Sequence, residues 1–282
     1  MAAFTDNHWQ DSNWQSWYQN FDEHHSLAER RHWYSQVATA YRWARPRYPN
    51  TLIEQVIAQA KLSAADASPG SMSASVLEVG CGPGIATAAL AAKNLTITAI
   101  EPSSAACALA RQACKDYPNV NIYNSTFEEY PLNTQQFDAV LAATSFHWLS
   151  PDTACQKSAA ALKPGGSLIL LWATPPQPSA EICHALQPIY DRYQLSDMGQ
   201  EQYRTQAYYQ HNFETLANTV NDSGFFQPSR VTIQRCQSTY SIEKYLALLS
   251  TLSGYIALEE QVRENLLLAL SAQLAQQLEQ VH

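Results

Sequence analysis

The sequence predicts an α/β protein built on a doubly wound, mostly parallel β-sheet, with a helical N-terminal arm and helical additions at the C-terminal side. Short apolar segments alternate with helical segments over residues 75–173, and the loops between them are short, as in repeated βα units. Residues 166–173 are apolar at nearly every position, which is typical of a central strand covered on both faces. The 282 residues are enough to bury a core without disulfides or metal ions.

The predicted sheet has its strands at residues 75–79, 95–100, 120–124, 137–142 and 166–173. Helices are predicted between them at residues 85–93, 104–116 and 152–162. Right-handed crossovers place the turn after every strand along one edge of the sheet, which is where ligands bind in such folds.

The segments on either side of this unit are predicted to be mostly helical. Residues 1–60 form the expected arm or lid, in which Arg45-Pro46 and Tyr48-Pro49 mark a bend, because each proline disfavours helix in the residue before it. Residues 61–175 form the sheet core. Residues 176–282 form a helical cap that supplies one more strand of the sheet. Its helices are predicted at residues 180–193, 200–209, 214–222, 242–250 and 259–278, and its strand at residues 230–237.

Composition excludes several classes of protein. A net charge of −8 argues against a general nucleic-acid binder, since neutralisation of phosphates dominates that affinity. The apolar runs are far shorter than the roughly 18–20 residues of a membrane span, and the first residues have no signal-peptide pattern, so a cytoplasmic protein is expected. The 6 cysteines are scattered and have no ligand spacing, so no metal site is predicted.

The turn after the first predicted strand carries the clearest chemical signal. It contains three glycines at alternate positions, Gly80, Gly82 and Gly84, which let the backbone pass close under a ligand. The third glycine comes one residue too early for a nicotinamide dinucleotide site. Glu78 suits a cationic ligand better than a pyrophosphate, which its carboxylate would repel. Glu101 ends the second strand, where an acid accepts hydrogen bonds from the ribose hydroxyls of an adenosine.

In order along the chain, these motifs resemble those of class I S-adenosylmethionine (SAM) methyltransferases, in the small-molecule branch known as type 11. The matching segments are Glu78-Val79-Gly80-Cys81-Gly82-Pro83-Gly84, Glu101, Thr126-Phe127-Glu128, Phe137-Asp138, Thr144-Ser145-Phe146-His147-Trp148 and Leu162-Lys163-Pro164-Gly165-Gly166. The resemblance covers residues 35–175 and implies a Rossmann-like core that binds SAM and leaves S-adenosylhomocysteine (SAH) as product.

A closer likeness is to the trans-aconitate methyltransferase-like subgroup. Its pattern Y-x-x-x-R-P-x-Y-P is present as Tyr41, Arg45-Pro46 and Tyr48-Pro49, and its His-Trp pair as His147-Trp148. The family usually closes its sheet with an antiparallel hairpin, but no clear strand follows Gln237.

The motifs and the resemblance together imply a set of site residues. The expected cofactor-binding residues are Tyr41, Arg45, Glu78, Gly80, Cys81, Gly82, Gly84, Glu101, Pro102, Thr126, Phe127 and Thr144. Arg45 is a candidate to hold the carboxylate of SAM or of an anionic substrate, and the alternative is that it belongs to a solvated helix face. His147 is the candidate catalytic base, because an imidazole titrates near neutral pH. The alternative for His147 is that it lines the pocket without titrating, since methylation of a carboxylate needs no base.

The sequence therefore predicts a SAM-dependent methyltransferase acting on a small molecule, with an anionic substrate such as a carboxylic acid as the candidate acceptor. The alternative is a SAM-binding protein without transferase activity, acting as a sensor or scaffold, and turnover distinguishes the two. An RNA methyltransferase is disfavoured by the charge and by the lack of an aromatic and basic platform beyond residues 30–48. Neither a nucleic-acid partner nor a membrane partner is expected.

Overall fold

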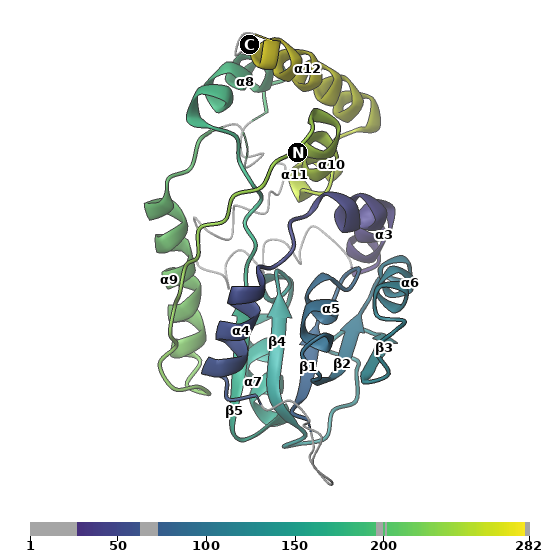
Figure 1. Ribbon diagram of the computed structural model, residues 1–282, viewed down its shortest axis with the longest axis vertical. Helices are drawn as coiled ribbons and strands as arrows, with labels where there is room; N and C mark the ends of the chain where they lie inside the picture. The colour runs from purple at the N-terminus through teal and green to yellow at the C-terminus, as the bar shows by residue number, and fades with distance from the viewer. Residues whose placement is uncertain (1–26, 63–72, 196–199, 201, 280–282) are drawn as a thin grey trace.

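The computed structural model describes residues 27–62, 73–195, 200 and 202–279. Its centre is a fully parallel sheet of five strands in the order β3-β2-β1-β4-β5 (Figure 1). The strands are β1 (Ser75–Val79), β2 (Thr96–Glu101), β3 (Val120–Asn124), β4 (Phe137–Ala143) and β5 (Leu162–Leu171). The predicted α/β class with a doubly wound parallel sheet is confirmed.

The order of the strands creates a crevice at one edge of the sheet. From β1 the chain moves outward through β2 and β3 and then crosses back to β4 on the other side of β1. Helices that follow β1 and β4 therefore leave in opposite directions, and the crevice between them lies at the carboxyl ends of these two strands. Ligands bind at this switch point in doubly wound sheets.

Helices cover both faces of the sheet. One face packs on α4 (Asn50–Gln59), α5 (Ile85–Ala91) and α6 (Ser104–Ala113), through a core that includes Ile53, Leu90 and Ala110. The other face packs on α7 (Pro151–Ala161) and, beyond it, α9 (Gln206–Asp222). Alternate residues of β4 serve the two cores, with Val140 on one side and Leu141 on the other, as the period of a strand requires.

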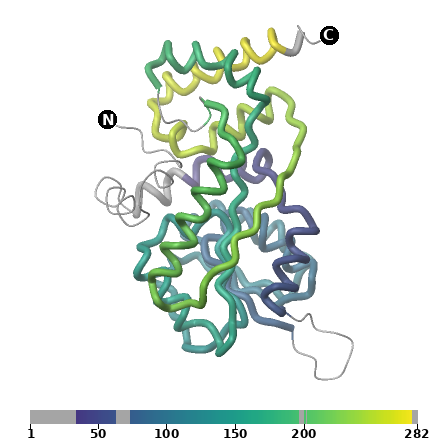
Figure 2. Tube along the Cα trace, turned by 90° about the vertical axis from the view of Figure 1, so that its left-hand side faces the viewer, coloured from purple at the N-terminus to yellow at the C-terminus, as the bar shows by residue number. Residues whose placement is uncertain are grey.

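A separate helical cluster lies beyond the carboxyl ends of the strands (Figures 1 and 2). It contains α8 (Ala180–Arg192), α10 (Ile242–Leu249), α11 (Ser253–Ile256) and α12 (Glu260–Glu279). Its core includes Tyr190 and Tyr255, whose buried hydroxyls share a hydrogen bond of 2.6 Å. The helix α3 (Leu27–Ala44) contacts both α6 and α10, so it joins this cluster, which we call the cap, to the sheet.

The predicted bend of the arm is also present, because α3 ends at Ala44 and α4 begins at Asn50. Residues 1–26 of the predicted arm lie outside the described residues. No helix among the described residues has the length and apolar character that crossing a membrane requires. The described part of the chain also has no cluster of three or more His, Cys, Asp or Glu side chains that could bind a metal ion.

Three predictions about the elements are wrong. Residues 230–237 form no strand, because this largely exposed segment pairs with no neighbour; one of its few ties is the hydrogen bond from Gln234 to Thr51. The two helices predicted at residues 200–209 and 214–222 are one helix, α9, which starts where the Thr205 side chain caps it and contains no glycine or proline to break it. The strand β5 is covered on both faces but lies at an edge of the sheet instead of its centre.

Candidate functional site

A cavity lies at the carboxyl ends of β1, β2 and β4, between the sheet and α3. Its empty space, including the open mouth toward solvent, is about 1330 Å³. The lining comes from the bend between α3 and α4, from the turns after β1, β2 and β4, and from the segment after β3. The structure thus places its cavity at the edge that the strand order marks for ligands.

Most of the residues predicted to bind the cofactor line this cavity. They are Tyr41, Arg45, Glu78, Gly80, Cys81, Gly82, Glu101, Pro102, Thr126, Phe127 and Thr144. The structure does not place Gly84 or His147 in the lining.

Each glycine of the turn after β1 meets a different structural requirement. Gly80 has φ +68, and a Cβ there would lie 2.6 Å from the Cβ of Ser145, so the turns after β1 and β4 approach each other only because this side chain is absent. Gly82 has φ +53 with open space around the position of a Cβ, so its bare backbone faces the cavity. Gly84 has φ +84, and a Cβ there would lie 3.0 Å from the Cα of Ala110. Gly84 therefore serves the packing of α5 on α6.

Glu101 holds the floor of the cavity together. Its Oε2 accepts a hydrogen bond of 2.9 Å from the Gly82 N–H, and its Oε1 accepts one of 2.8 Å from the Ser103 N–H. Burial raises the pKa of this carboxyl, while the two backbone donors lower it. A carboxylate oxygen can accept more than one hydrogen bond, so Glu101 keeps acceptor capacity for a ligand.

Glu78 is the most unusual group in the lining. It has 0% exposure, and neither of its carboxyl oxygens has a hydrogen-bond partner among the described residues. Burial raises its pKa to about 8; the nearby Thr87 hydroxyl lowers this pKa without making a hydrogen bond of normal geometry, and the negative charge of Glu101 raises it further. A buried polar group without a partner costs free energy. A ligand that brings a positive charge or a hydrogen-bond donor to this carboxyl therefore gains the most binding free energy there.

The opposite wall is built around Arg45 at the bend between α3 and α4. The Arg45 guanidinium donates to the hydroxyl of Thr251 at 2.9 Å and to its carbonyl at 3.2 Å, and it lies 4.8 Å from the centre of the Tyr41 ring. Among the described residues that line the cavity, Arg45 is the only cation. A guanidinium has five N–H donors, so these contacts leave some of its donors for a ligand.

Tyr48 and Thr144, which both line the cavity, lie side by side. The two hydroxyls lie 3.2 Å apart, and burial raises the pKa of the Tyr48 phenol well above its ordinary value. Thr144 has φ 57, which is uncommon for a residue with a side chain and is found at functional sites. Its hydroxyl also accepts from the Ala173 N–H at 3.3 Å.

The segment after β3 supplies Thr126, Phe127 and Glu128 to the lining. Thr126 and Phe127 are buried, and the Thr126 hydroxyl accepts a hydrogen bond of 3.1 Å from the Glu129 N–H.

His147 lies outside the cavity lining. It is 3% exposed and sits in the short helix η1 (Phe146–Trp148), with its ring 5.0 Å from that of Trp148 and 6.3 Å from that of Trp172. Its neighbour Trp148 does line the cavity. A role for His147 as a base stays a prediction that this geometry does not favour.

Sequence reasoning left several lining residues unassigned, among them Tyr34, Tyr48 and Ser103. Tyr48 belongs to the tyrosine and proline pattern of the bend, which was a usable signal. Tyr34 packs edge-to-face on Trp148 with the ring centres 5.5 Å apart, and no local pattern marks that contact.

Comparison with known proteins agrees with this geometry. Residues 76–166 match the family model described as "Methyltransferase domain". The match runs from β1 to the start of β5 and contains the glycine turn, Glu101 and the segment after β3. Residues 76–166 are therefore similar to a methyltransferase domain.

The curated relatives of this chain are themselves named as uncharacterised methyltransferases. One from Mycobacterium tuberculosis is 31% identical over 141 residues, which cover 50% of this chain and 52% of the relative. A methyltransferase-like protein of Schizosaccharomyces pombe is 28% identical over 135 residues, 48% of each chain. The chain thus spans about half the length of the curated relatives it matches.

Solved structures share the fold of residues 76–166 and of much of the remaining chain. A protein named as a methyltransferase from an antibiotic biosynthesis pathway of Anabaena variabilis has a TM-score of 0.53 at 16% identity, over 80% of this chain and 85% of that one. A protein named as a type II methyltransferase from Anaeromyxobacter dehalogenans has a TM-score of 0.50 at 18% identity, over 82% and 88%. At these identities the likeness establishes the Rossmann-like methyltransferase fold alone.

Proposed function

We propose that this protein is a SAM-dependent methyltransferase that transfers a methyl group to a small-molecule acceptor and releases SAH. The observation that carries the proposal is Glu78, a fully buried carboxyl without a hydrogen-bond partner among the described residues, on the wall of the cavity. An ammonium or sulfonium group is the ligand chemistry that such a carboxyl favours. SAM carries both groups, and its sulfonium makes the attached methyl electrophilic.

The other lining residues suit the rest of this ligand. Glu101 retains acceptor capacity for ribose hydroxyls at the end of β2, and Gly82 presents bare backbone to the cavity. Thr126 and Phe127 are the candidates to flank the base. The role of the protein in such a transfer is alignment of nucleophile, methyl and sulfur, which is worth several kcal/mol of a typical barrier.

We assign the acceptor side to the bend between α3 and α4, which belongs to the proposed arm, residues 1–60, and adjoins the proposed core, residues 61–175. Arg45 supports an anionic acceptor, because it is the only cation among the described lining residues and a guanidinium pairs well with a carboxylate. Transfer to a carboxylate oxygen needs no general base, which agrees with the position of His147 outside the lining. A carboxylic acid is therefore the acceptor class that we propose to test first.

Calorimetric titration with SAH tests the cofactor site. We expect wild-type protein to bind SAH and Glu101→Ala to weaken binding by about 1.5–3 kcal/mol, the usual loss for hydrogen bonds to a charged group. Glu264→Ala is the matched control, since this glutamate is exposed on α12 and its loss should leave the affinity unchanged. Absence of SAH binding to the wild type would refute the proposal.

Turnover decides between an enzyme and a SAM-binding sensor or scaffold. The purified protein would be incubated with SAM and a panel of carboxylic acids, phenols and amines, and SAH release would be measured. Release that depends on an acid supports the proposed acceptor class. Tight SAH binding with no release on any acceptor would favour the sensor.

A further inference from the structure

The turn that follows β3 has little secondary structure to hold it, although the four residues from Ser125 to Glu128 line the cavity. Its internal hydrogen bonds are few. The Tyr130 N–H donates to the Thr126 carbonyl at 3.1 Å, and the Glu129 N–H donates to the Thr126 hydroxyl at the same distance. The carbonyls of Phe127, Glu128 and Tyr130 all face away from these bonds, toward one point on α7.

Lys157 of α7 occupies that point. Its Nζ donates to the carbonyls of Phe127 at 2.5 Å, of Tyr130 at 2.8 Å and of Glu128 at 2.9 Å. An ammonium has three N–H donors, so this one lysine uses all of them to satisfy three carbonyls of the same turn. Its Nζ also lies 5.3 Å from the centre of the Phe127 ring. Lys157 itself does not line the cavity.

These contacts also determine the directions of backbone N–H groups. In a trans peptide the carbonyl of one residue points opposite to the N–H of the next. The ammonium that holds the Phe127 and Glu128 carbonyls therefore turns the N–H groups of Glu128 and Glu129 to the other side. The Glu129 N–H reaches the Thr126 hydroxyl in this way, and Glu128 belongs to the lining of the cavity.

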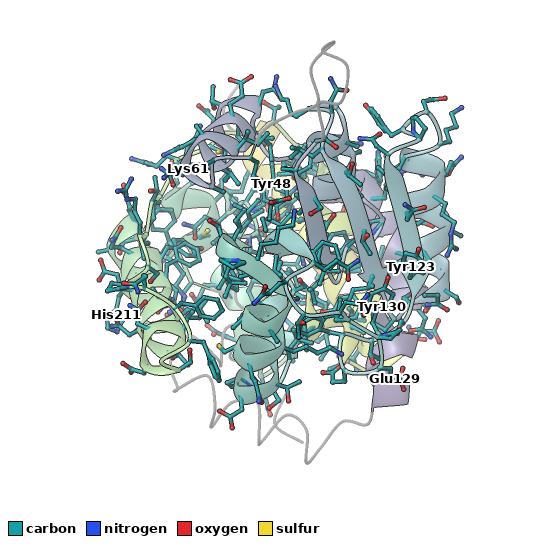
Figure 3. The ribbon with its side chains drawn as sticks, turned by 90° about the horizontal axis from the view of Figure 1, so that it is seen from below. Tyr48, Lys61, Tyr123, Glu129, Tyr130 and His211 are labelled. Carbon is teal, nitrogen blue, oxygen red and sulfur yellow. The ribbon has the colours of Figure 1, made fainter. Side chains whose placement is uncertain are left out.

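A second contact holds the far end of the turn. The rings of Tyr123 and Tyr130 lie 5.2 Å apart, and Figure 3 shows them together, with Glu129 close by. The turn is thus held by β3 at Tyr130 and by α7 at three carbonyls. Loss of Lys157 would leave those carbonyls directed at one another, and the electrostatic repulsion would change the path of the backbone.

We propose that Lys157 is a positioning residue for the base of the bound nucleoside: it fixes the backbone of residues 126–130 in the conformation that contacts that base. The inference rests on the proposed function, because it takes the ligand to be SAM or SAH. Lys157 acts through the turn and does not touch the ligand.

The test compares Lys157→Met with Lys163→Met, titrating each with SAH and with adenosine. Lys163 is a matched control because its Nζ pairs with Asp138 at 2.8 Å at the start of β4 and β5, at the opposite edge of the sheet. We expect Lys157→Met to weaken the binding of SAH and of adenosine by the same factor, about tenfold, as for one or two lost charged hydrogen bonds. Lys163→Met should change neither affinity, whatever it does to stability.

Lys157→Arg keeps the charge but places its donors in a planar fork, so its affinity for both ligands should fall between those of wild type and Lys157→Met. This variant decides the matter if Lys157→Met does not fold. Unchanged affinities in the Lys157 variants, or an equal loss in Lys163→Met, would overturn the inference while leaving the proposed function intact. Failure of the wild type to bind SAH would overturn both.

Discussion

At the scale of single residues, Glu78 shows that a side chain at a candidate site can lower the stability of the folded protein. The carboxyl is completely buried, and no described residue donates a hydrogen bond to it. Its pKa of about 8 means that the carboxyl is mostly protonated near neutral pH. A residue of this kind is expected where function, and not folding, requires the side chain.

The pKa of Glu78 predicts a pH-dependent cost to stability. Because the pKa rises from its ordinary value of 4.5 to about 8 in the folded protein, the native state keeps a proton that the unfolded chain loses between these values. The free energy of unfolding therefore falls as pH rises through this window. Relative to Glu78→Gln, the wild type should lose up to about 1.4 kcal/mol per pH unit between pH 5 and 7.5. Urea unfolding of both proteins at several pH values measures this.

A cationic ligand against the ionised carboxyl should reduce that slope, so the same titration with saturating SAH links the stability effect to the proposed site. If the free energies of unfolding of wild type and Glu78→Gln depend on pH in the same way without ligand, burial does not raise the pKa of Glu78 as described.

At the scale of elements, the glycine turn between β1 and α5 combines two tasks that substitution can separate. Gly84→Ala would place a Cβ 3.0 Å from the Cα of Ala110 at φ +84, so strain and overpacking should cost about 2–4 kcal/mol of stability. Gly82→Ala, at φ +53 in open space, should cost only about 1–2 kcal/mol but should impair SAH binding. Urea unfolding and SAH titration of both variants check this. The expectation fails if Gly84→Ala mainly affects binding and leaves stability intact.

The elements also show which parts of the molecule were predictable. The strands and helices of the core follow from local patterns, since each apolar segment between turn residues is buried in the same kind of βα unit. A strand also needs a neighbour to pair with, and residues 230–237 have none, which their own sequence could not reveal. The break predicted inside α9 is not marked by a glycine or a proline. Nothing in the sequence interrupts the helix there, so it continues according to its backbone propensity.

The candidate site was predictable to the same extent. Glu78, Gly82 and Glu101 lie in turns next to strands, so the topology alone brings them to one edge. His147 follows β4 in sequence, but it lies in a turn of 3₁₀-helix, where neighbouring side chains point about 120° apart. In that turn Trp148 lines the cavity and His147 does not. The partner of Arg45 lies 206 residues away in sequence, and no local pattern predicts such a contact.

At the scale of the whole molecule, polar contacts of Tyr240 and Thr251 join the cap to the bend beside the cavity. The Tyr240 hydroxyl donates to the Ala44 carbonyl at 2.7 Å, just before the bend. Thr251, which follows α10, accepts from Arg45 through both its hydroxyl and its carbonyl. Arg45 thus lines the cavity on one side and contacts the cap on the other, so the orientation of this cavity-lining group depends on the position of the cap.

Thr251→Val tests this dependence, because Thr251 does not line the cavity. Valine keeps the backbone carbonyl but removes the hydroxyl that accepts the Arg45 Nε–H, which would leave a buried guanidinium donor without its acceptor at a cost of about 1–3 kcal/mol in stability. Affinity for SAH, or for an anionic acceptor, should also fall by about 0.5–2 kcal/mol, as for residues that influence a site without contacting the ligand. Thr219→Val is the control, since that hydroxyl bonds only within α9, to the Thr215 carbonyl. If the Thr251 variant loses stability while every affinity stays at the wild-type value, the cap serves the fold alone, and Arg45 is oriented by the bend itself.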